Sequence, residues 1–318
     1  MELIRGLHNL KPRHQGCVAT IGNFDGVHLG HVKVLSQVRA AGERFGCPTL
    51  AIIFEPQPRE FFDIASAPPR ITRLRDKVRY LQEAGIDAVL CLPFNDKLRS
   101  LPALAFVNAV LLEGLRVRHF VVGDDFRFGC DRAGDFTLLQ QIGATCGFVV
   151  ENTHTFSLHG ARVSSSRIRE LLADAQLARA EKMLGRSYAI SGRVEYGQQL
   201  GRTIGVPTAN ISLRGKQPAL RGVFAVEVLG LGGLPMPAVA NIGMRPTVKG
   251  IKPNLEVHLL DYSGNLYGQH IDVVFRHYIR AEQRFPDLQA LTTQIHLDIA
   301  HARNWFERRE AADETYSA

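Results

Sequence analysis

Short apolar runs alternate with amphipathic stretches through the first half of the chain, and this rhythm restricts the possible folds more than any other feature. The runs are rich in Val, Ile and Leu and have the length of strands buried on both faces of a sheet; they are CVATIG (17–22), TLAIIF (49–54), DAVLCL (87–92) and HFVVG (119–123). Between them, residues 31–46, 72–85 and 102–115 space their apolar side chains as helices do. The pattern predicts a Rossmann-like α/β domain with a doubly wound parallel sheet.

A different pattern begins near residue 185. Strand-like runs separated by turns that contain Gly or Pro indicate an all-β barrel or sandwich; they span residues 187–197, 222–230, 236–243, 254–261 and 271–277. Residues 286–310 are predicted to form a terminal helix, because their apolar side chains fall on one face. We therefore expect two unrelated domains, residues 1–183 and 184–318.

Composition excludes several classes of protein. No apolar run reaches the ~20 residues of a membrane-spanning helix, and residues 1–16 lack the apolar core of a secretory signal. The five cysteines form no CxxC pair, which predicts a reducing, cytoplasmic setting without structural zinc. The net charge of +7 includes no block of five Lys or Arg, so we expect small anionic substrates rather than nucleic acid. We also expect a monomer or a weak homo-oligomer.

Two histidines stand where the first strand is followed by a helix, in the segment ATIGNFDGVHLGH (19–31). In a doubly wound sheet, ligands bind beyond the carboxyl ends of the strands. The three glycines of this segment allow the backbone to turn sharply, and the helix N-terminus offers N–H groups to an anion. His28 and His31 are therefore candidates for stabilising charge on a phosphate. A zinc pair and ordinary surface residues are the alternatives.

A second segment, RVSSSRIREL (162–171), places three hydroxyl groups directly before a predicted helix. One serine is enough to cap a helix, so residues 164–166 exceed what capping requires. Two arginines in the first turn, one of them Arg169, oppose the helix dipole, which suggests that an anionic ligand binds there. The alternative is a Ser-rich loop with solvated arginines.

GNFDGVHLGH together with SSSRIR is similar to the nucleotidyltransferase superfamily, which joins AMP or CMP to a phosphorylated substrate. FEPQPREFF (54–62) and VVGDDFRFG (121–129) narrow the resemblance to the adenylyltransferase half of the prokaryotic bifunctional riboflavin kinase/FAD synthetase family. The resemblance implies that the FMN phosphate attacks the α-phosphorus of ATP directly, giving FAD and pyrophosphate without an enzyme nucleophile. Where the family most often has Ser-Ser-Thr, this chain has a third serine, Ser166, which keeps the hydroxyl group.

The same resemblance implies roles for single residues. His28 and His31 would contact the ATP phosphates and stabilise the transition state, and Arg169 would clamp a phosphate. The flavin would meet two aromatic rings, for which core packing is the alternative, and an aspartate near its phosphate. The predicted flavin-binding set is Phe61, Phe62 and Asp125, and the predicted ATP-binding set is Gly22, Phe24, Asp25, Gly26, His28, His31, Ser164, Ser165 and Arg169.

GRTIGVPTAN (201–210) is the most informative stretch of the second half. Gly201 and Gly205 permit an unusual backbone, and the proline after them biases the chain toward an extended conformation. Thr208 and Asn210 would then point to one side, where hydroxyl and amide oxygens suit Mg²⁺ with its bound phosphates. The alternative is a plain loop, because Gly-rich turns and Pro-Thr pairs also occur without a ligand.

Glu256 alternates with apolar residues along a predicted strand, and a single carboxylate there is more often a solvated edge residue than a base. PTAN, RGVFAVEV, VANIGMRPTV and LEVHLLD, however, resemble the riboflavin kinase domain, a six-stranded barrel. The resemblance implies that Thr208 and Asn210 bind Mg-ATP and that Glu256 is the general base for the 5′-hydroxyl of riboflavin. It also implies that residues 241–247 line the flavin or the nucleotide. At residues 198–200, Gln-Gln-Leu departs from the basic residue that the family usually has there.

Two other interpretations remain open at this point. The chain could be an adenylyltransferase for phosphopantetheine or nicotinamide mononucleotide with an unrelated appendage, but such enzymes have no barrel with PTAN and a strand glutamate. It could also be a basic module that binds RNA or DNA, with steep salt dependence. That interpretation leaves the acidic and hydroxyl residues of both motif sets unexplained.

Overall fold

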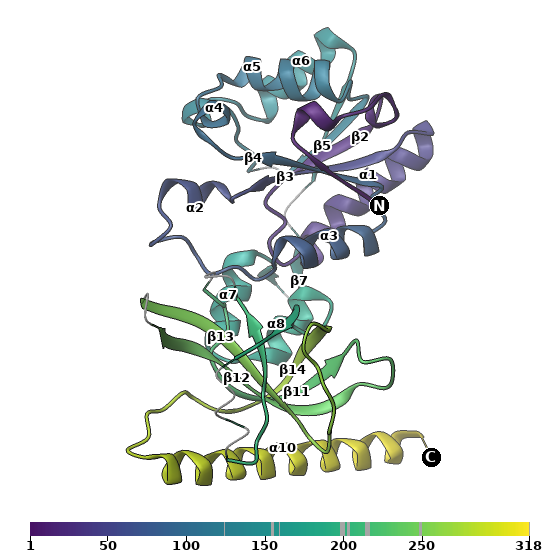
Figure 1. Ribbon diagram of the computed structural model, residues 1–318. Helices are drawn as coiled ribbons and strands as arrows, with labels where there is room; N and C mark the ends of the chain where they lie inside the picture. Colours follow the sequence, from purple (N-terminus) through teal and green to yellow (C-terminus); the bar gives the residue numbers. More distant parts are fainter. Residues whose placement is uncertain are drawn as a thin grey trace. The chain divides into compact units, whose positions relative to one another are not determined.

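The structure of this chain is a computed structural model that describes residues 1–123, 125–153, 156–158, 160–197, 201, 204–213, 217–247 and 250–317. It divides into two compact units, of which the first comprises Met1–Pro68 and Thr72–Ser165 and the second Pro69–Ile71 and Ser166–Ala318 (Figure 1). The expected division into functional domains at residues 183 and 184 stays a prediction.

A six-stranded sheet forms the centre of the first unit, and all of its strands run parallel. In spatial order the strands are β1 (Glu2–Arg5), β4 (Ala88–Pro93), β3 (Thr49–Glu55), β2 (Val18–Ile21), β5 (His119–Gly123) and β6 (Val149–Thr153). The four predicted strands are confirmed as β2, β3, β4 and β5. The edge strands β1 and β6 have no sequence signal, because both are short and neither is a continuous apolar run.

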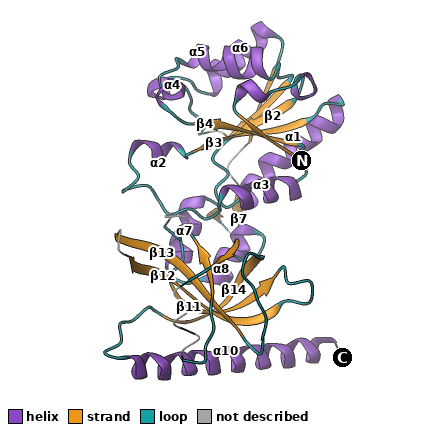
Figure 2. Ribbon diagram, viewed as in Figure 1, coloured by secondary structure: helices purple, strands orange, loops and turns teal. Residues whose placement is uncertain are grey.

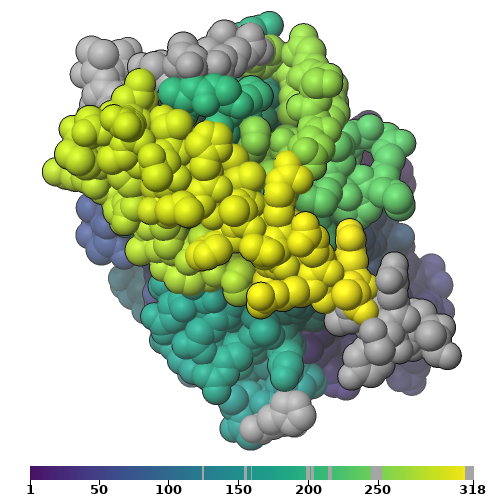
Figure 3. Space-filling view, turned by 90° about the horizontal axis from the view of Figure 1, so that it is seen from below, coloured from purple at the N-terminus to yellow at the C-terminus, as the bar shows by residue number. Residues whose placement is uncertain are grey.

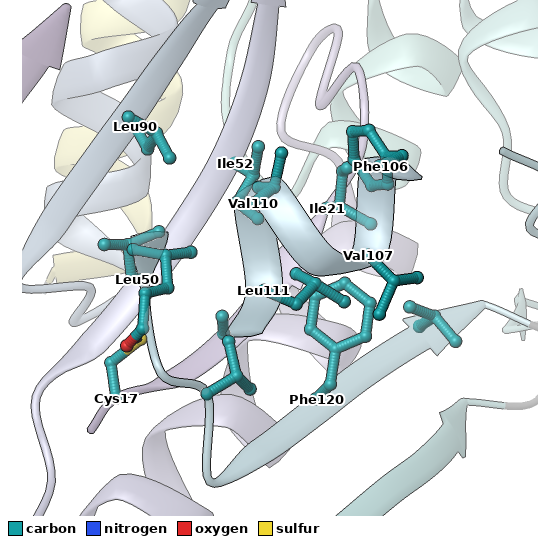
Figure 4. Packing of buried hydrophobic residues seen from close by; sticks show 14 of the residues in the cluster. Cys17, Ile21, Leu50, Ile52, Leu90, Phe106, Val107, Val110, Leu111 and Phe120 are labelled. Atoms are coloured by element: carbon teal, nitrogen blue, oxygen red, sulfur yellow. Dashed lines mark hydrogen bonds between the residues drawn. The ribbon is translucent and has the colours of Figure 1, made fainter. Parts of the chain in front are cut away.

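Helices cover both faces of this sheet (Figure 2). The helical segments are η1 (Leu7–Asn9), η2 (Pro12–His14), α1 (Leu29–Phe45), α2 (Pro58–Phe62), α3 (Leu74–Glu83), α4 (Asp96–Arg99), α5 (Ala103–Phe106), η3 (Val107–Gly114), η4 (Cys130–Arg132) and α6 (Phe136–Cys146), and a short hairpin of β7 (Ser157–Leu158) and β8 (Ala161–Arg162) follows. α1 and α3 bury one face, where Val18 of β2 clusters with Leu35 of α1. α5, η3 and α6 bury the other, where Leu111 of η3 lies near Phe120 of β5 (Figure 4). The predicted doubly wound α/β fold is therefore confirmed.

The third predicted helix, residues 102–115, has an irregular form. It begins as α5 and continues as η3, which is a π-helix. Apolar spacing indicates that a segment coils but does not distinguish the wider π turn from the α turn, so the sequence predicts only a helix here.

The second unit is a closed barrel of antiparallel strands with helices around it. In spatial order the strands are β10 (Ala209–Ser212), β13 (Gly250–Leu259), β12 (Met236–Thr247), β11 (Gly222–Leu229), β14 (His270–Arg280) and β9 (Ala189–Glu195), and α7 (Ser165–Ala173) and α8 (Leu177–Leu184) precede them in the chain. The sequence pattern allows a barrel or a sandwich. The pairing of β9 with both β10 and β14 closes the sheet, which confirms the six-stranded barrel.

One long helix, α10 (Leu288–Ser317), lies across the barrel and confirms the predicted terminal helix (Figure 3). Phe306 is buried in the same cluster as Val223 of β11. Arg280, at the end of β14, forms two hydrogen bonds of 2.8 and 2.7 Å with the carboxylate of Asp298 on α10. Moving the helix away from the barrel would leave each of these two charges without its partner, which is unfavourable for a buried pair. The contact therefore holds the helix on the barrel.

Candidate functional sites

A strained loop connects β2 to α1 in the first unit. Gly26 has a φ of 88°, and the non-glycine residues Phe24 and Val27 also have positive φ values, 45° and 38°. Positive φ is uncommon outside glycine, and a sparsely populated conformation costs about 1–3 kcal/mol per residue. Such a loop persists only where other contacts hold it, and strain of this kind is typical of ligand-binding segments.

Asp25 supplies contacts that hold the loop. Its carboxylate is buried, and Oδ1 accepts hydrogen bonds from the N–H and the hydroxyl of Thr72, at 3.0 and 3.2 Å. The Thr72 hydroxyl oxygen accepts the N–H of Gly26 at 2.9 Å, and the hydroxyl of Ser165 donates to the Asp25 carbonyl at 2.8 Å. The structure thus gives Asp25 a supporting place in the loop, and direct contact of its carboxylate with ATP stays a prediction.

His28 and His31 stack on one another at the start of α1. Their ring centroids lie 3.6 Å apart with the planes at 17°, and the Phe24 ring meets His31 edge-on at 5.2 Å. His28 caps the helix, because its Nδ1 accepts the backbone N–H of His31 at 3.3 Å. A neutral His28 ring therefore carries its proton on Nε2. Gly30 leaves room for that ring, since a Cβ there would lie 3.2 Å from it and 3.3 Å from the Val163 carbonyl oxygen.

These residues line a cavity of about 310 Å³. It lies at the carboxyl ends of β2, β5 and β6, where a doubly wound sheet binds its ligands. Asp125 lies at this cavity, and its exposed carboxylate pairs with Arg162 at 2.9 Å. The sequence-predicted residues that the structure brings together here are Gly22, Phe24, His28, His31, Asp125, Ser164 and Ser165.

Other predicted residues lie elsewhere. Phe61 and Phe62 pack against Phe94, with ring centroids 5.4 and 5.8 Å from it, and neither lines the cavity. Arg169 belongs to the second unit, where its Nε donates to the Pro69 carbonyl at 2.8 Å. Contact of the two aromatic rings with a flavin, and of Arg169 with a phosphate, therefore stay predictions.

Three residues with polar side chains that line the cavity are absent from the sequence-based set. Thr20 is within the motif 19–31, one residue before the end of β2, and that position could have indicated it. Thr153 ends β6, an edge strand without a sequence signal. Arg162 opens the serine-rich segment, and a cation next to three hydroxyl groups is a signal for an anion site.

In the second unit, a tight turn precedes β10. The N–H of Val206 donates to the Gly201 carbonyl at 2.7 Å, and Gly205 has a φ of 75°. A Cβ on Gly201 would lie 2.2 Å from the Val206 carbonyl oxygen, so a larger residue cannot take its place without moving the turn. The turn delivers Thr208 to the start of β10 and Asn210 into it, in the extended conformation that the sequence predicts.

Cross-strand register brings the other predicted residues of the barrel together. Asn210 of β10 pairs with Glu256 of β13, which pairs on its other side with Asn241 of β12. Along β13, Leu255 and Val257 are buried in the barrel core, whereas Glu256 is only half-buried. The polar side chains of three neighbouring strands therefore share the outer face of the sheet.

Two residues outside the predicted set complete this face. Asn254 Nδ2 donates to Oε1 of Glu256 at 2.9 Å and to Oδ1 of Asn210 at 3.2 Å. His258 Nδ1 lies 2.8 Å from the Pro207 carbonyl oxygen, which can only accept, so Nδ1 carries the proton. Both lie two residues from Glu256 on a strand, and this spacing is the signal that could have found them.

A cavity of about 350 Å³ lies between this polar face and α10. The barrel side includes Thr208, Asn210, Asn241, Glu256 and His258. The helix side is mostly apolar, with Leu288, Leu291, Ile295 and Ile299, and includes Asp298. Glu282 also lines the cavity, and burial raises the pKa of its carboxyl group. The departure at residues 198–200, and the side chains at 245–247 of the predicted lining, are outside the described residues.

Comparison with known families and proteins covers both units. The family described as FAD synthetase matches residues 10–167, and the family described as riboflavin kinase matches residues 184–306. A bifunctional riboflavin kinase/FMN adenylyltransferase of Escherichia coli K12 is 53% identical over 307 residues, covering 96% of this chain and 98% of that protein. The Pseudomonas fluorescens protein of the same name is 52% identical over 304 residues, covering 95% and 97%.

A crystal structure described as a macrolide-efflux protein from Streptococcus pneumoniae has a similar fold, with a TM-score of 0.77 and 26% sequence identity. The similarity covers 95% of this chain and 99% of that one. In the part of this chain that the structure describes, no helix is long and apolar enough to cross a membrane.

Proposed function

The chain belongs to the family of bifunctional riboflavin kinase/FMN adenylyltransferases, which make FMN from riboflavin and FAD from FMN, and from that premise we propose that it divides the two reactions between its two sites. One observation carries this division. Each unit has its own cavity, and among the described residues each cavity is lined by members of only one of the two motif sets.

In the first unit, the cavity around His28 and His31 is the proposed site of adenylyl transfer. The FMN phosphate attacks the α-phosphorus of ATP there, and pyrophosphate leaves. Since His28 Nδ1 is engaged by the helix, its Nε2 proton is the one that can donate to a phosphate oxygen as charge develops. The N–H groups at the start of α1 and the hydroxyl of Ser164 add donors of the same kind, and the Ser165 hydroxyl supports the loop through the Asp25 carbonyl.

The flavin would bind on the side of the cavity where Asp125 lies. Asp125 pairs with Arg162 at the cavity, so we propose that Arg162 provides the positive charge for a phosphate of FMN while Asp125 orients it. Phe61 and Phe62 are proposed to contact the isoalloxazine, and Arg169 to clamp a phosphate. The support for the last three is the family resemblance of their segments.

In the second unit, Glu256 is the proposed general base. It would take the proton from the riboflavin 5′-hydroxyl while that oxygen attacks the γ-phosphorus of ATP and ADP leaves. The apolar side of the cavity, formed by Leu288, Leu291 and Ile295 of α10, suits the flat flavin ring system, and the polar side suits its hydroxylated chain.

Mg²⁺ fits the oxygen donors next to Glu256. Among the described residues, no group of three or more His, Cys, Asp or Glu side chains is placed to hold a metal. Thr208 and Asn210 offer a hydroxyl and an amide oxygen, which suit a cation that keeps most of its ligands from water and phosphate. When bound, Mg²⁺ would neutralise charge on the ATP phosphates, and these two residues would hold it.

Substrate conversion tests the assignment directly. Purified protein with riboflavin, ATP and Mg²⁺ should form FMN first and FAD later, resolved by chromatography over a time course. A protein that forms neither product would overturn the proposal. A protein that forms FAD from supplied FMN but no FMN from riboflavin would overturn the part that concerns the barrel.

Setting and assembly are further proposals. We propose that the enzyme works in the cytoplasm as a monomer or weak homo-oligomer and does not bind nucleic acid. None of the five cysteines, all of which the structure describes, is in a disulfide bond, which is consistent with a reducing compartment. Filter binding of RNA and DNA at two salt concentrations tests the last point, because tight and steeply salt-dependent retention would contradict it.

A further inference from the structure

We propose that Asn254 is a positioning residue of the kinase reaction, whose single amide group sets the orientation of both Glu256 and Asn210. The proposal rests on the roles proposed above for those two residues. It starts from two hydrogen bonds made by one nitrogen atom, of 2.9 Å to Glu256 and 3.2 Å to Asn210.

The chemistry of the three side chains leaves one arrangement for these bonds. A carboxylate only accepts hydrogen bonds, so Asn254 must turn its nitrogen, not its oxygen, toward Glu256. That nitrogen has two protons, and the second lies toward Asn210, which must therefore present its amide oxygen. The charge on Glu256 thus fixes Asn254, and Asn254 in turn fixes the oxygen of Asn210 that the kinase step requires.

Strand geometry makes this arrangement rigid. Asn254 lies opposite Ser212 on β10 and opposite Gly243 on β12, two register positions along the sheet from the pairing of Glu256 with Asn210. It therefore contacts Glu256 along its own strand and Asn210 diagonally across to the next strand. Asn254 does not line the cavity, so it acts behind the reacting groups rather than on the substrate.

The consequence is a base held in one position. Hydrogen-bond reach to the substrate hydroxyl is the first requirement of a general base. The hydrogen bond from Asn254 limits rotation of the Glu256 carboxylate and so fixes the direction in which this group faces the substrate hydroxyl. The second hydrogen bond restrains rotation of the Asn210 amide group. The base and the phosphate-binding oxygen therefore keep fixed positions relative to one another.

The sharpest test is Asn254→Asp, which keeps the shape of the side chain, removes both donated bonds and adds a negative charge next to Glu256. Two neighbouring carboxylates resist ionising together, so the acidic limb of the kcat–pH profile for FMN formation should move up by about one pH unit. At pH values below the wild-type limb, kcat should fall about tenfold, and this loss should disappear as the pH rises above the displaced limb. A profile that superimposes on the wild-type profile overturns the proposal.

Other ionisable groups line the same cavity, and the comparison between variants keeps them constant. They are His258 on the same strand, Arg280 at the end of β14, Glu282 after that strand, and Asp298 on α10; Arg280 and Asp298 are paired. Because all of them are present in wild type and variant alike, a displacement of the limb reports on the substitution at residue 254.

Two further variants separate positioning from simple packing. Asn254→Ala should lower kcat about tenfold at every pH and raise KM for Mg-ATP, with KM for riboflavin within about twofold of wild type. Asn254→Ser keeps one hydroxyl donor and should recover part of the loss. If alanine and serine variants have equal kcat, or if all variants only lower the thermal midpoint without these kinetic changes, the proposal fails. This pair also decides the matter if Asn254→Asp does not fold.

Glu256→Gln distinguishes failure of this inference from failure of the proposed function. If Glu256→Gln forms FMN at the wild-type rate, Glu256 is not the base, and the function assigned to this face and the role of Asn254 both fall. If Glu256→Gln is inactive while Asn254→Asp keeps the wild-type pH profile, only the role of Asn254 falls.

Discussion

The two cavities differ in how they hold their polar groups. In the first unit, the groups stand on a loop in which Phe24 and Val27 have positive φ and whose shape depends on Asp25. In the barrel, Asn210 and Glu256 stand on regular strands, directly opposite one another in the sheet. The polar groups of the first site are therefore held by a strained loop, and those of the second by the pairing register of a whole sheet.

The difference fits the chemistry proposed for each. Stabilising charge on a phosphate needs many donors around an anion, and a tight loop at a helix N-terminus supplies them. Removing a proton needs one base at one distance from one hydroxyl group, and strands hold such distances more closely than loops do. If this comparison is right, changes at either site should affect one reaction and leave the other intact.

Replacing Glu256 should give the largest effect. Glu256→Gln keeps the size of the side chain but removes the base, so FMN formation should fall about 10²–10⁴-fold. FAD formation from supplied FMN should stay within about twofold of wild type, measured by chromatography under initial-rate conditions. Glu307→Gln, an exposed carboxylate on α10, is the matched control. Loss of both activities in folded Glu256→Gln protein would break the division between the sites.

Replacing either stacked histidine should give the reverse result. His28→Ala or His31→Ala removes a donor to the ATP phosphates, so FAD formation should fall about 10²–10³-fold while FMN formation continues. The double variant should lose less than the product of the single losses, because the stacked rings act together. His8→Ala, an exposed histidine of the same unit, is the control. Multiplicative losses would mean that the two rings act independently.

A smaller effect is expected where the barrel leaves no space. A Cβ on Gly197 would lie 2.4 Å from Nδ2 of Asn210, so Gly197→Ala should displace that amide and raise KM for Mg-ATP about tenfold in the kinase assay alone. Gly233→Ala, where a Cβ meets nothing within 4 Å, is the control. Wild-type kinetics for Gly197→Ala would show that the sheet tolerates movement of Asn210, against the rigidity argued for this site.

The same contrast explains which parts the sequence predicts. Buried central strands such as β5 are recognisable because both faces demand apolar residues, and the turn around Gly201 is recognisable because glycine has a steric reason to be there. The edge strand β6 is half-exposed and carries polar residues, so its sequence resembles a loop. The position of Thr153 in the first cavity follows from that strand and could not be predicted without it.

Residues whose type suits two different roles are harder to assign from the sequence. Phe61 and Phe62 suit either a ligand or a core; the structure places them in a cluster with Phe94, and their contact with a flavin stays a prediction. Asn254 and His258 are ordinary polar residues for the outer face of a strand. Their importance depends on which side chain lies diagonally across the sheet, and that is fixed by strand pairing rather than by any local pattern.

The smallest expected effect is a difference between the two units in how their activities are lost in acid. Hydrogen bonds from His14 and Arg13 lower the pKa of Glu2 in the first unit from its ordinary value of 4.5 to about 2. In the second unit, the Arg303 guanidinium lowers the pKa of Asp261. A carboxyl group with a lowered pKa in the folded state stabilises the protein above its unfolded value, and this contribution is lost as the pH falls toward the folded value. For Glu2 the pH window of this loss lies between about 4.5 and about 2.

Glu2→Gln should therefore flatten the acid-induced loss of FAD-forming activity, and Asp261→Asn that of FMN-forming activity. Each activity is assayed at pH 7 after mild heating at pH 3 to 6. Crossed effects would contradict the view that each unit carries its own reaction.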